Sequence, residues 1–243
     1  MQAAHFFWPS ELDRKNEVRL VRAKEVGGFL IVGGIVILAG ILVAQSLYPG
    51  YDPSKSAISD LGAPVELAYD QSPGVLSIEQ PASIVFISSF LLGTIFIIQA
   101  ARLSPDTGNE RWFRRFLTLF GAGALLVVLS YVPYYAYSGQ WIPGSYASDP
   151  SAVIAGALVH LVGAVMIFIF GGLAAVASYR FLRRPASFLP MVTGLIIIAA
   201  FLLNLGRVDL GLGNGGIERL AAYSLFLWMA GLGVYLRFYK KVN

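Results

Sequence analysis

The sequence contains no cysteine and only two histidines among its 243 residues. Without cysteine, the chain has no disulfide bonds, thiolate metal sites, cysteine nucleophiles or lipids attached through sulfur. Charged residues are also scarce, at 13% of the chain, whereas hydrophobic residues make up 56%. A soluble domain of this length does not need so many apolar side chains, so the surplus indicates a membrane protein.

The apolar residues are gathered in six long stretches. A hydrocarbon core about 30 Å thick is crossed by roughly 20 helical residues, and each stretch is long enough for that. We therefore predict an all-α fold: a polytopic bundle of six transmembrane helices. The predicted spans are 27–47, 81–101, 113–132, 152–179, 188–205 and 221–238.

The distribution of basic residues predicts the orientation of the bundle. Of the 18 lysines and arginines, those outside the predicted spans lie mainly in the two termini, in the loop between the second and third spans, and in the loop between the fourth and fifth spans. All of these segments fall on one side of the membrane, whereas Lys55, Arg207 and Arg219 fall on the other. Because basic residues are retained in the cytoplasm, both termini should be cytoplasmic and the long first loop extracytoplasmic. The predicted location is the cell membrane.

The two ends of the chain are polar. Residues 1–26 mix basic and acidic side chains behind three aromatics, which favours an amphipathic segment on the cytoplasmic face over a tail that binds nucleic acid or a partner. Residues 239–243 form a short cytoplasmic tail. We expect membrane lipids as partners, with other membrane subunits or a second copy as further possibilities, and no nucleic acid.

Glycines repeat at intervals of seven residues in the first and fourth spans. This spacing keeps small residues on one helix face through two turns and lets a second helix approach closely. The pairs are Gly27 with Gly34, Gly33 with Gly40, and Gly156 with Gly163.

A polar stretch, Tyr48–Gly62, follows the first span. Its two prolines and two glycines interrupt a helix, and its serines can cap one, so we predict a turn followed by a short polar helix. It should lie at the outer rim, near the charged residues that end the fifth span and begin the sixth. The resulting candidate cluster, for a ligand or for structural support, is Ser56, Ser59, Asp60, His160, Arg207, Asp209, Glu218 and Arg219.

Two interpretations of this cluster stay open. Opposite charges near hydrocarbon usually pair, which would clamp the first loop onto the last two helices. Alternatively, His160, Asp60 and Glu218 are candidate catalytic residues. His160 has glycine and alanine at three and four positions on either side, which leaves room for another helix or a ligand to reach its ring. It could equally be a neutral histidine bonded to a neighbouring helix.

Metal and anion sites receive less support. A three-histidine zinc site is excluded because His5 and His160 are the only histidines and lie on opposite predicted sides. A site of His160 with two carboxylates stays possible, but we predict no metal and no cofactor. The segment 211–216 could hold an anion on its amides, yet it follows no strand and is better interpreted as a turn and helix cap.

Three short motifs resemble one known family. They are Ser59–Gly62 after a Pro-Gly-Tyr turn, Gly156–His160 at the start of a long fourth helix, and Gly216–Arg219 followed by Trp228. Together they resemble the six-helix integral membrane proteins of domain of unknown function family 998, over roughly residues 27–238. The resemblance implies the fold and topology, but no reaction.

A second similarity is more distant. Ser56, Asp60 and His160 resemble parts of the Ser, Asp and His pattern of the seven-helix superfamily of alkaline ceramidases and progestin/adipoQ receptors. That superfamily has three histidines around zinc and a seventh helix, which this chain lacks.

Three functions are compatible with the sequence. The favoured one is a non-enzymatic membrane protein that binds a lipid headgroup or another subunit through a polar site at the extracytoplasmic rim. The alternative is an intramembrane lipid-modifying enzyme of hydrolase type, using His160 with the rim carboxylates. A small-solute transporter is a third possibility, although polar residues are scarce at mid-depth.

Overall fold

The computed structural model describes most of the chain. The described residues are 11–62, 65–66, 76–77, 81–106, 108, 110–131, 150–182 and 186–239. The predicted amphipathic segment lies outside them from residue 1 to 10, and the predicted tail from 240 to 243.

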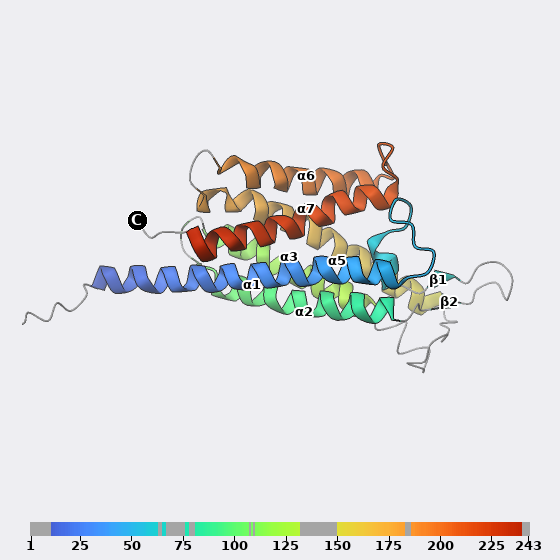
Figure 1. Ribbon diagram of the computed structural model, residues 1–243, viewed down its shortest axis with the longest axis horizontal. Coiled ribbons are helices and arrows are strands. Elements are labelled where there is room, and N and C mark those ends of the chain that lie inside the picture. Colours follow the sequence, from blue (N-terminus) through green and yellow to red (C-terminus); the bar gives the residue numbers. More distant parts are fainter. Residues whose placement is uncertain are drawn as a thin grey trace, which may run out of the picture.

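Six long helices account for the described fold, as predicted (Figure 1). Each is long and apolar enough to cross a membrane. A backbone in hydrocarbon must satisfy its own hydrogen bonds, so long apolar runs form helices there. The helices are α1 (Glu11–Leu47), α2 (Ala82–Leu103), α3 (Glu110–Ser130), α5 (Pro150–Ala177), α6 (Phe188–Leu205) and α7 (Asn214–Val234).

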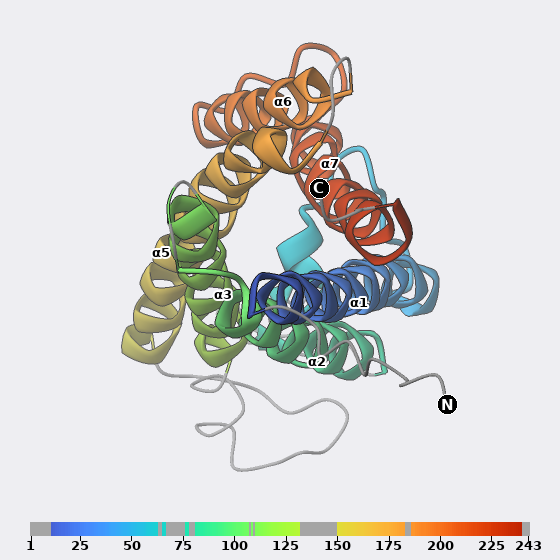
Figure 2. The same cartoon turned by 90° about the vertical axis from the view of Figure 1, so that its left-hand side faces the viewer.

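The helices form a closed ring in chain order. Each packs on the next, and α7 returns to α1. Figure 2 looks along the bundle and shows a short 3₁₀-helix, η1 (Ile58–Leu61), inside this ring near one end. Further short elements are η2 (Ser178–Phe181), η3 (Tyr235–Tyr239) and an antiparallel strand pair, β1 (Val65–Glu66) with β2 (Leu76–Ser77).

Two helices begin at least seven residues before the predicted spans. α1 runs without interruption from Glu11, so no break in the helix separates residues 11–26 from the first span at residue 27. α7 begins at Asn214 rather than 221, because its glycine-rich first turn is helical and packs against the first loop.

The glycine pairs of α1 lie at close helix crossings. Gly27 and Gly34 face α7. A Cβ added to Gly27 would lie 2.6 Å from the Gly233 carbonyl oxygen, and one added to Gly34 would lie 2.8 Å from the Phe226 carbonyl oxygen. Gly33 and Gly40 face α2 through Gly93 and Ser89. The predicted use of glycine for helix contact is therefore confirmed for this helix.

Two further glycine contacts set the tilt of α5. Near its C-terminal end, Gly172 lies against Gly194 of α6, and near its middle, Gly163 lies against Gly123 of α3. α5 is thus held to α6 at one end of the bundle and to α3 further along. Figure 1 shows the two helices α5 and α6 separating towards the end that carries η1.

The Gly163 crossing provides a test of this arrangement. In Gly163→Ala, the new Cβ would lie 2.8 Å from the Gly123 oxygen and 2.9 Å from the Val127 nitrogen. We expect a loss of about 1–3 kcal/mol in the free energy of unfolding, because neither backbone atom can move away cheaply. The midpoint of unfolding in detergent measures this.

Gly231→Ala is the matched control. Nothing lies within 4 Å of the position that a Cβ would take there, so alanine should be neutral or stabilise the helix by up to about 1 kcal/mol. Equal midpoints for the two variants would contradict a close crossing at Gly163.

Candidate functional site

Residues 48–62, here called the rim loop, fold back over one end of the bundle. Asp52 starts the turn, since its Oδ1 accepts from the backbone N–H of Ser54 at 2.9 Å. η1 follows, and its Ile58 and Leu61 side chains are buried inside the helix ring. The prediction of a turn followed by a short helix is confirmed in outline, and the helix is a single 3₁₀ turn.

Arg219 of α7 holds the rim loop by its carbonyl oxygens. The side chain is buried, and its Nη1 donates to the carbonyls of Pro53 at 2.6 Å and Ser56 at 2.9 Å. Nη1 also donates to the Gly215 carbonyl of its own helix at 2.9 Å. A guanidinium carries five N–H donors in a fixed fork, which suits it to several acceptors at once.

The other side of the guanidinium reaches α1 and a tyrosine. Nε and Nη2 donate to Gln45 Oε1 at 3.0 and 2.7 Å, and Nη2 donates to the Tyr51 hydroxyl at 2.6 Å. That hydroxyl in turn donates to the Ala57 carbonyl at 2.6 Å. Burial raises the pKa of Tyr51 to about 12, although Arg219 lowers it, so the phenol keeps the proton that it donates.

The first turn of α7 lies directly against the rim loop. The Gly215 N–H donates to the Ser54 carbonyl at 3.1 Å, which caps one of the free amides at this helix start. A Cβ on Gly215 would overlap the Ser56 carbonyl oxygen, and Gly213 adopts a positive φ of 76°. The glycine-rich segment therefore serves as a turn and a docking surface, and one of its amides is already occupied by protein.

Glu218 holds the same loop by its N–H groups. Its Oε2 accepts from the Ile58 N–H at 3.0 Å. Asp60 binds locally, since its Oδ2 accepts from the Ala57 N–H at 2.8 Å. Burial raises the pKa of Asp60, while the hydrogen bond from Ala57 and the charge of Arg219 oppose that shift.

The predicted cluster therefore divides into three parts. Ser56, Ser59, Asp60, Glu218 and Arg219 meet at the rim loop, and His160 faces a cavity beneath it. Arg207 is exposed in the α6–α7 loop, where Asp209 accepts from the Gly211 N–H at 2.9 Å. The expected pairing of opposite charges does not occur here: the ion pairs among the described residues are Asp52 with Lys55 and Asp106 with Arg114.

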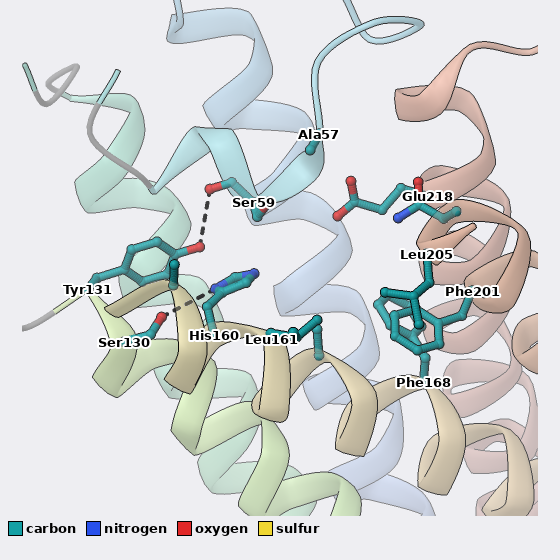
Figure 3. A pocket seen from close by; sticks show the side chains of 13 residues that line it. Ala57, Ser59, Ser130, Tyr131, His160, Leu161, Phe168, Phe201, Leu205 and Glu218 are labelled. Atoms are coloured by element: carbon teal, nitrogen blue, oxygen red, sulfur yellow. Dashed lines mark hydrogen bonds between the residues drawn. The ribbon is translucent and has the colours of Figure 1, made fainter. Parts of the chain in front are cut away.

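A cavity of about 310 Å³ lies beneath η1, between α3, α5, α6 and α7 (Figure 3). His160 and Glu218 line it on facing sides, and Leu161 and Leu205 line its apolar part. These two leucines are 45% and 53% exposed, so the cavity reaches the apolar perimeter of the bundle where α5 and α6 separate. Its lining residues are Ala57, Ser59, Ser130, Tyr131, Ala157, His160, Leu161, Ala164, Phe168, Phe201, Asn204, Leu205 and Glu218.

Hydrogen bonding assigns the tautomer of His160. The Ser130 hydroxyl donates its one proton to the Val127 carbonyl at 2.6 Å. His160 Nδ1 lies 3.2 Å from that same hydroxyl oxygen, so this bonding pattern assigns the proton of the neutral ring to Nδ1, which donates it. In the neutral ring Nε2 then has a free lone pair, and Figure 3 shows this nitrogen turned away from Ser130 into the cavity.

Sequence reasoning missed four residues of this region. Gln45 and Tyr51 bind Arg219, while Ser130 and Tyr131 hold His160 and the rim loop, the Tyr131 hydroxyl donating to the Ser59 carbonyl at 3.1 Å. Ser130 is the last residue of α3, and Tyr131 follows it. Because successive transmembrane helices alternate in direction, this end of α3 must lie at the same membrane face as the start of α5. Their position was therefore a usable signal.

The described residues contain no group of three or more His, Cys, Asp or Glu side chains arranged to hold a metal ion. Within the cavity, the acidic and histidine side chains that line it are Glu218 and His160.

Arg219→Lys tests the loop clamp. A lysine ammonium cannot reach Gln45, Tyr51 and the loop carbonyls together, so we expect a loss of about 2–3 kcal/mol. The rim loop should also undock more often, which faster trypsin cleavage after Lys55 would report, since the Lys55 side chain is 83% exposed. The same exchange at exposed Arg207 is the control; equal cleavage rates in the two variants would contradict the clamp.

Asp60→Asn tests the buried carboxyl. Because folding raises the pKa of Asp60, the charged form costs free energy in the folded state at neutral pH, and that cost disappears as the group is protonated. Asparagine can still accept from Ala57 without that cost. We expect the variant to be at least as stable as the wild type near neutral pH.

The test is how the difference in stability between the wild type and Asp60→Asn changes with pH. The wild type should gain stability relative to Asp60→Asn as the pH falls through the raised folded value towards the unfolded pKa of about 3.9. Unfolding midpoints of both proteins across this range measure it. A wild type that loses stability relative to the variant over the same range would contradict the raised pKa.

Comparison with known proteins gives one result. The model of the family described as "Protein of unknown function (DUF998)" matches residues 31–235. Neither the curated proteins nor the solved structures contain a match to this chain. The family match covers all six helices in whole or in part, in keeping with the resemblance found in the sequence. This chain is a multi-pass, six-helix membrane protein that belongs to the family DUF998.

Proposed function

We propose that this protein binds a membrane lipid at the rim-loop end of the bundle. The polar head would occupy the cavity beside His160, and an acyl chain would leave between α5 and α6 into the surrounding membrane. With both termini cytoplasmic, as the basic residues predict, this site faces the extracytoplasmic leaflet.

The observation that carries the proposal is the free Nε2 of His160 in a cavity with an apolar exit. Ser130 fixes the ring, so the lone pair has a defined direction and a preformed space in front of it. Pockets with an apolar wall and a few converging polar groups are typical of small-molecule sites. Leu161 and Leu205 extend that apolar wall to the perimeter, which suits a ligand with a hydrocarbon tail.

The cavity has a structural cause that is independent of any ligand. The Gly172–Gly194 contact joins α5 to α6 at the far end of the bundle, and the Gly163–Gly123 contact draws α5 towards α3. α5 and α6 are therefore apart at the rim-loop end, where the clamped rim loop covers the space between them. A cavity kept open by backbone contacts does not depend on the rotamer of one side chain. This supports a permanent binding site.

The hydrolase alternative receives less support from the geometry. Glu218 faces His160 across the cavity, but its Oε2 binds the Ile58 N–H. His160 Nδ1 binds Ser130, and Asp60 binds its own loop. A Ser-His-Asp arrangement needs the histidine to be oriented by the acid. For the transporter alternative, the polar groups of the cavity lie at one end of the bundle and not at mid-depth. Binding of another subunit or of a second copy stays a prediction from the sequence.

Ala157→Phe tests the lipid site. Ala157 lines the cavity and is exposed, so a phenyl ring there can fill the space without a clash in the core. Native mass spectrometry of protein extracted gently from membranes should show a retained lipid on the wild type and a loss of at least fivefold in that lipid on the variant. The effect follows from volume, because the ring occupies the place of the headgroup.

Ala155→Phe is the matched control. It makes the same change on an exposed position of the same helix, outside the cavity lining. It should retain lipid like the wild type. Equal lipid retention by Ala157→Phe and Ala155→Phe would overturn the proposed site.

A further inference from the structure

The polar wall of the cavity combines hydrogen-bond acceptors with donors: besides His160 and Glu218, the Asn204 amide and the Ser59 hydroxyl line it. Of the described residues that line it, none is lysine or arginine. Arg219 is the nearest basic residue along the chain to a lining residue, and its N–H groups are directed at Gln45, Tyr51 and backbone carbonyls. A phosphate would thus enter a partly apolar space without a guanidinium or ammonium to neutralise it.

The two ionisable lining residues, His160 and Glu218, face each other across the cavity. His160 presents the lone pair of Nε2, since its proton is on Nδ1. Glu218 binds the Ile58 N–H through Oε2 and lines the cavity on the side that faces His160. A head that donates to His160 Nε2 and can also accept, as a hydroxyl does, matches this lining.

The size and charge of the cavity narrow the choice further. A volume of about 310 Å³ corresponds to roughly ten water-sized groups at about 30 Å³ each, enough for a small head and the beginning of a chain. A neutral hydroxyl is also cheaper to transfer from water than a charged ammonium.

From these observations we infer that the ligand is a neutral lipid with a small hydroxyl-bearing head, of the diacylglycerol class, and not an anionic phospholipid. This inference rests on the proposed lipid site. In the complex, one head hydroxyl donates to His160 Nε2, and the rest of the head lies towards Glu218. The acyl chains pass Leu161 and Leu205.

Competition between two lipids tests the headgroup class. The full-length protein is exchanged into detergent micelles with equal amounts of dioleoylglycerol and dioleoylphosphatidylglycerol, and the retained lipids are quantified by mass spectrometry. We expect the wild type to retain dioleoylglycerol in at least fivefold excess, and Ala157→Phe to lose it while Ala155→Phe does not.

Two substitutions at His160 separate the lone pair from the fold. Asparagine can replace Nδ1 towards Ser130 but has no atom at the Nε2 position, whereas glutamine can present an acceptor near that position. We expect His160→Asn to lower dioleoylglycerol retention by about fivefold, as the loss of one hydrogen bond would. His160→Gln should recover part of it, with unfolding midpoints of both variants showing whether the fold is kept.

The outcomes distinguish the two proposals. If the wild type prefers dioleoylphosphatidylglycerol and Ala157→Phe displaces that lipid, the proposed headgroup class is overturned but the lipid site stands. If Ala157→Phe changes the retention of neither lipid, both proposals are overturned. Equal dioleoylglycerol retention by wild type, His160→Asn and His160→Gln would overturn the role of Nε2.

Discussion

The backbone of the rim loop depends on two neighbouring side chains of α7. An irregular segment at a membrane boundary carries N–H and C=O groups that no helix ladder satisfies, and leaving them unpaired near hydrocarbon is costly. Glu218 supplies the acceptor for the N–H of Ile58, and Arg219 supplies donors for the carbonyls of Pro53 and Ser56. The two opposite charges are therefore used on backbone dipoles and not on each other.

This clamp and the tilt of α5 together create the cavity. The glycine contacts at Gly163 and Gly172 separate α5 from α6 at the rim-loop end, and η1 enters the ring there instead of a side chain from another helix. A single 3₁₀ turn fills less of the space than a helix would. The remaining volume lies where His160 and Glu218 face each other.

Much of the fold followed from elementary properties of the sequence, whereas the site followed only in part. The apolar runs predicted six helices because length and hydropathy are local properties, and the glycine spacing in α1 predicted its contacts because the helix period is fixed. The partners of Arg219 could not be predicted this way. Half of its six hydrogen bonds go to backbone carbonyls, two of them more than 160 positions away, and a carbonyl has no residue type to recognise.

The charged residues show the same limit from another side. Pairing by sign would have joined Glu218 or Asp60 to Arg219 or Arg207, because a charge count ignores backbone dipoles. Asp60 instead caps the turn that contains it, and Arg207 stays exposed. Similarly, a histidine among small residues indicates space around the ring, but its tautomer depends on Ser130, which belongs to another helix.

The helical period explains how adjacent residues of α7 serve two different surfaces. One residue corresponds to a rotation of about 100°, so positions four apart return to nearly the same face. Glu218, Ala222 and Phe226 form one such row and line a smaller cavity of about 40 Å³ that shares His160 with the larger one. The next row joins the rim loop and α1: Gly215 contacts the loop, Arg219 grips it, and the Tyr223 hydroxyl accepts from Gln45 at 3.5 Å. Because the guanidinium belongs to the second row, it donates to loop carbonyls, and the described residues that line the cavity include no lysine or arginine.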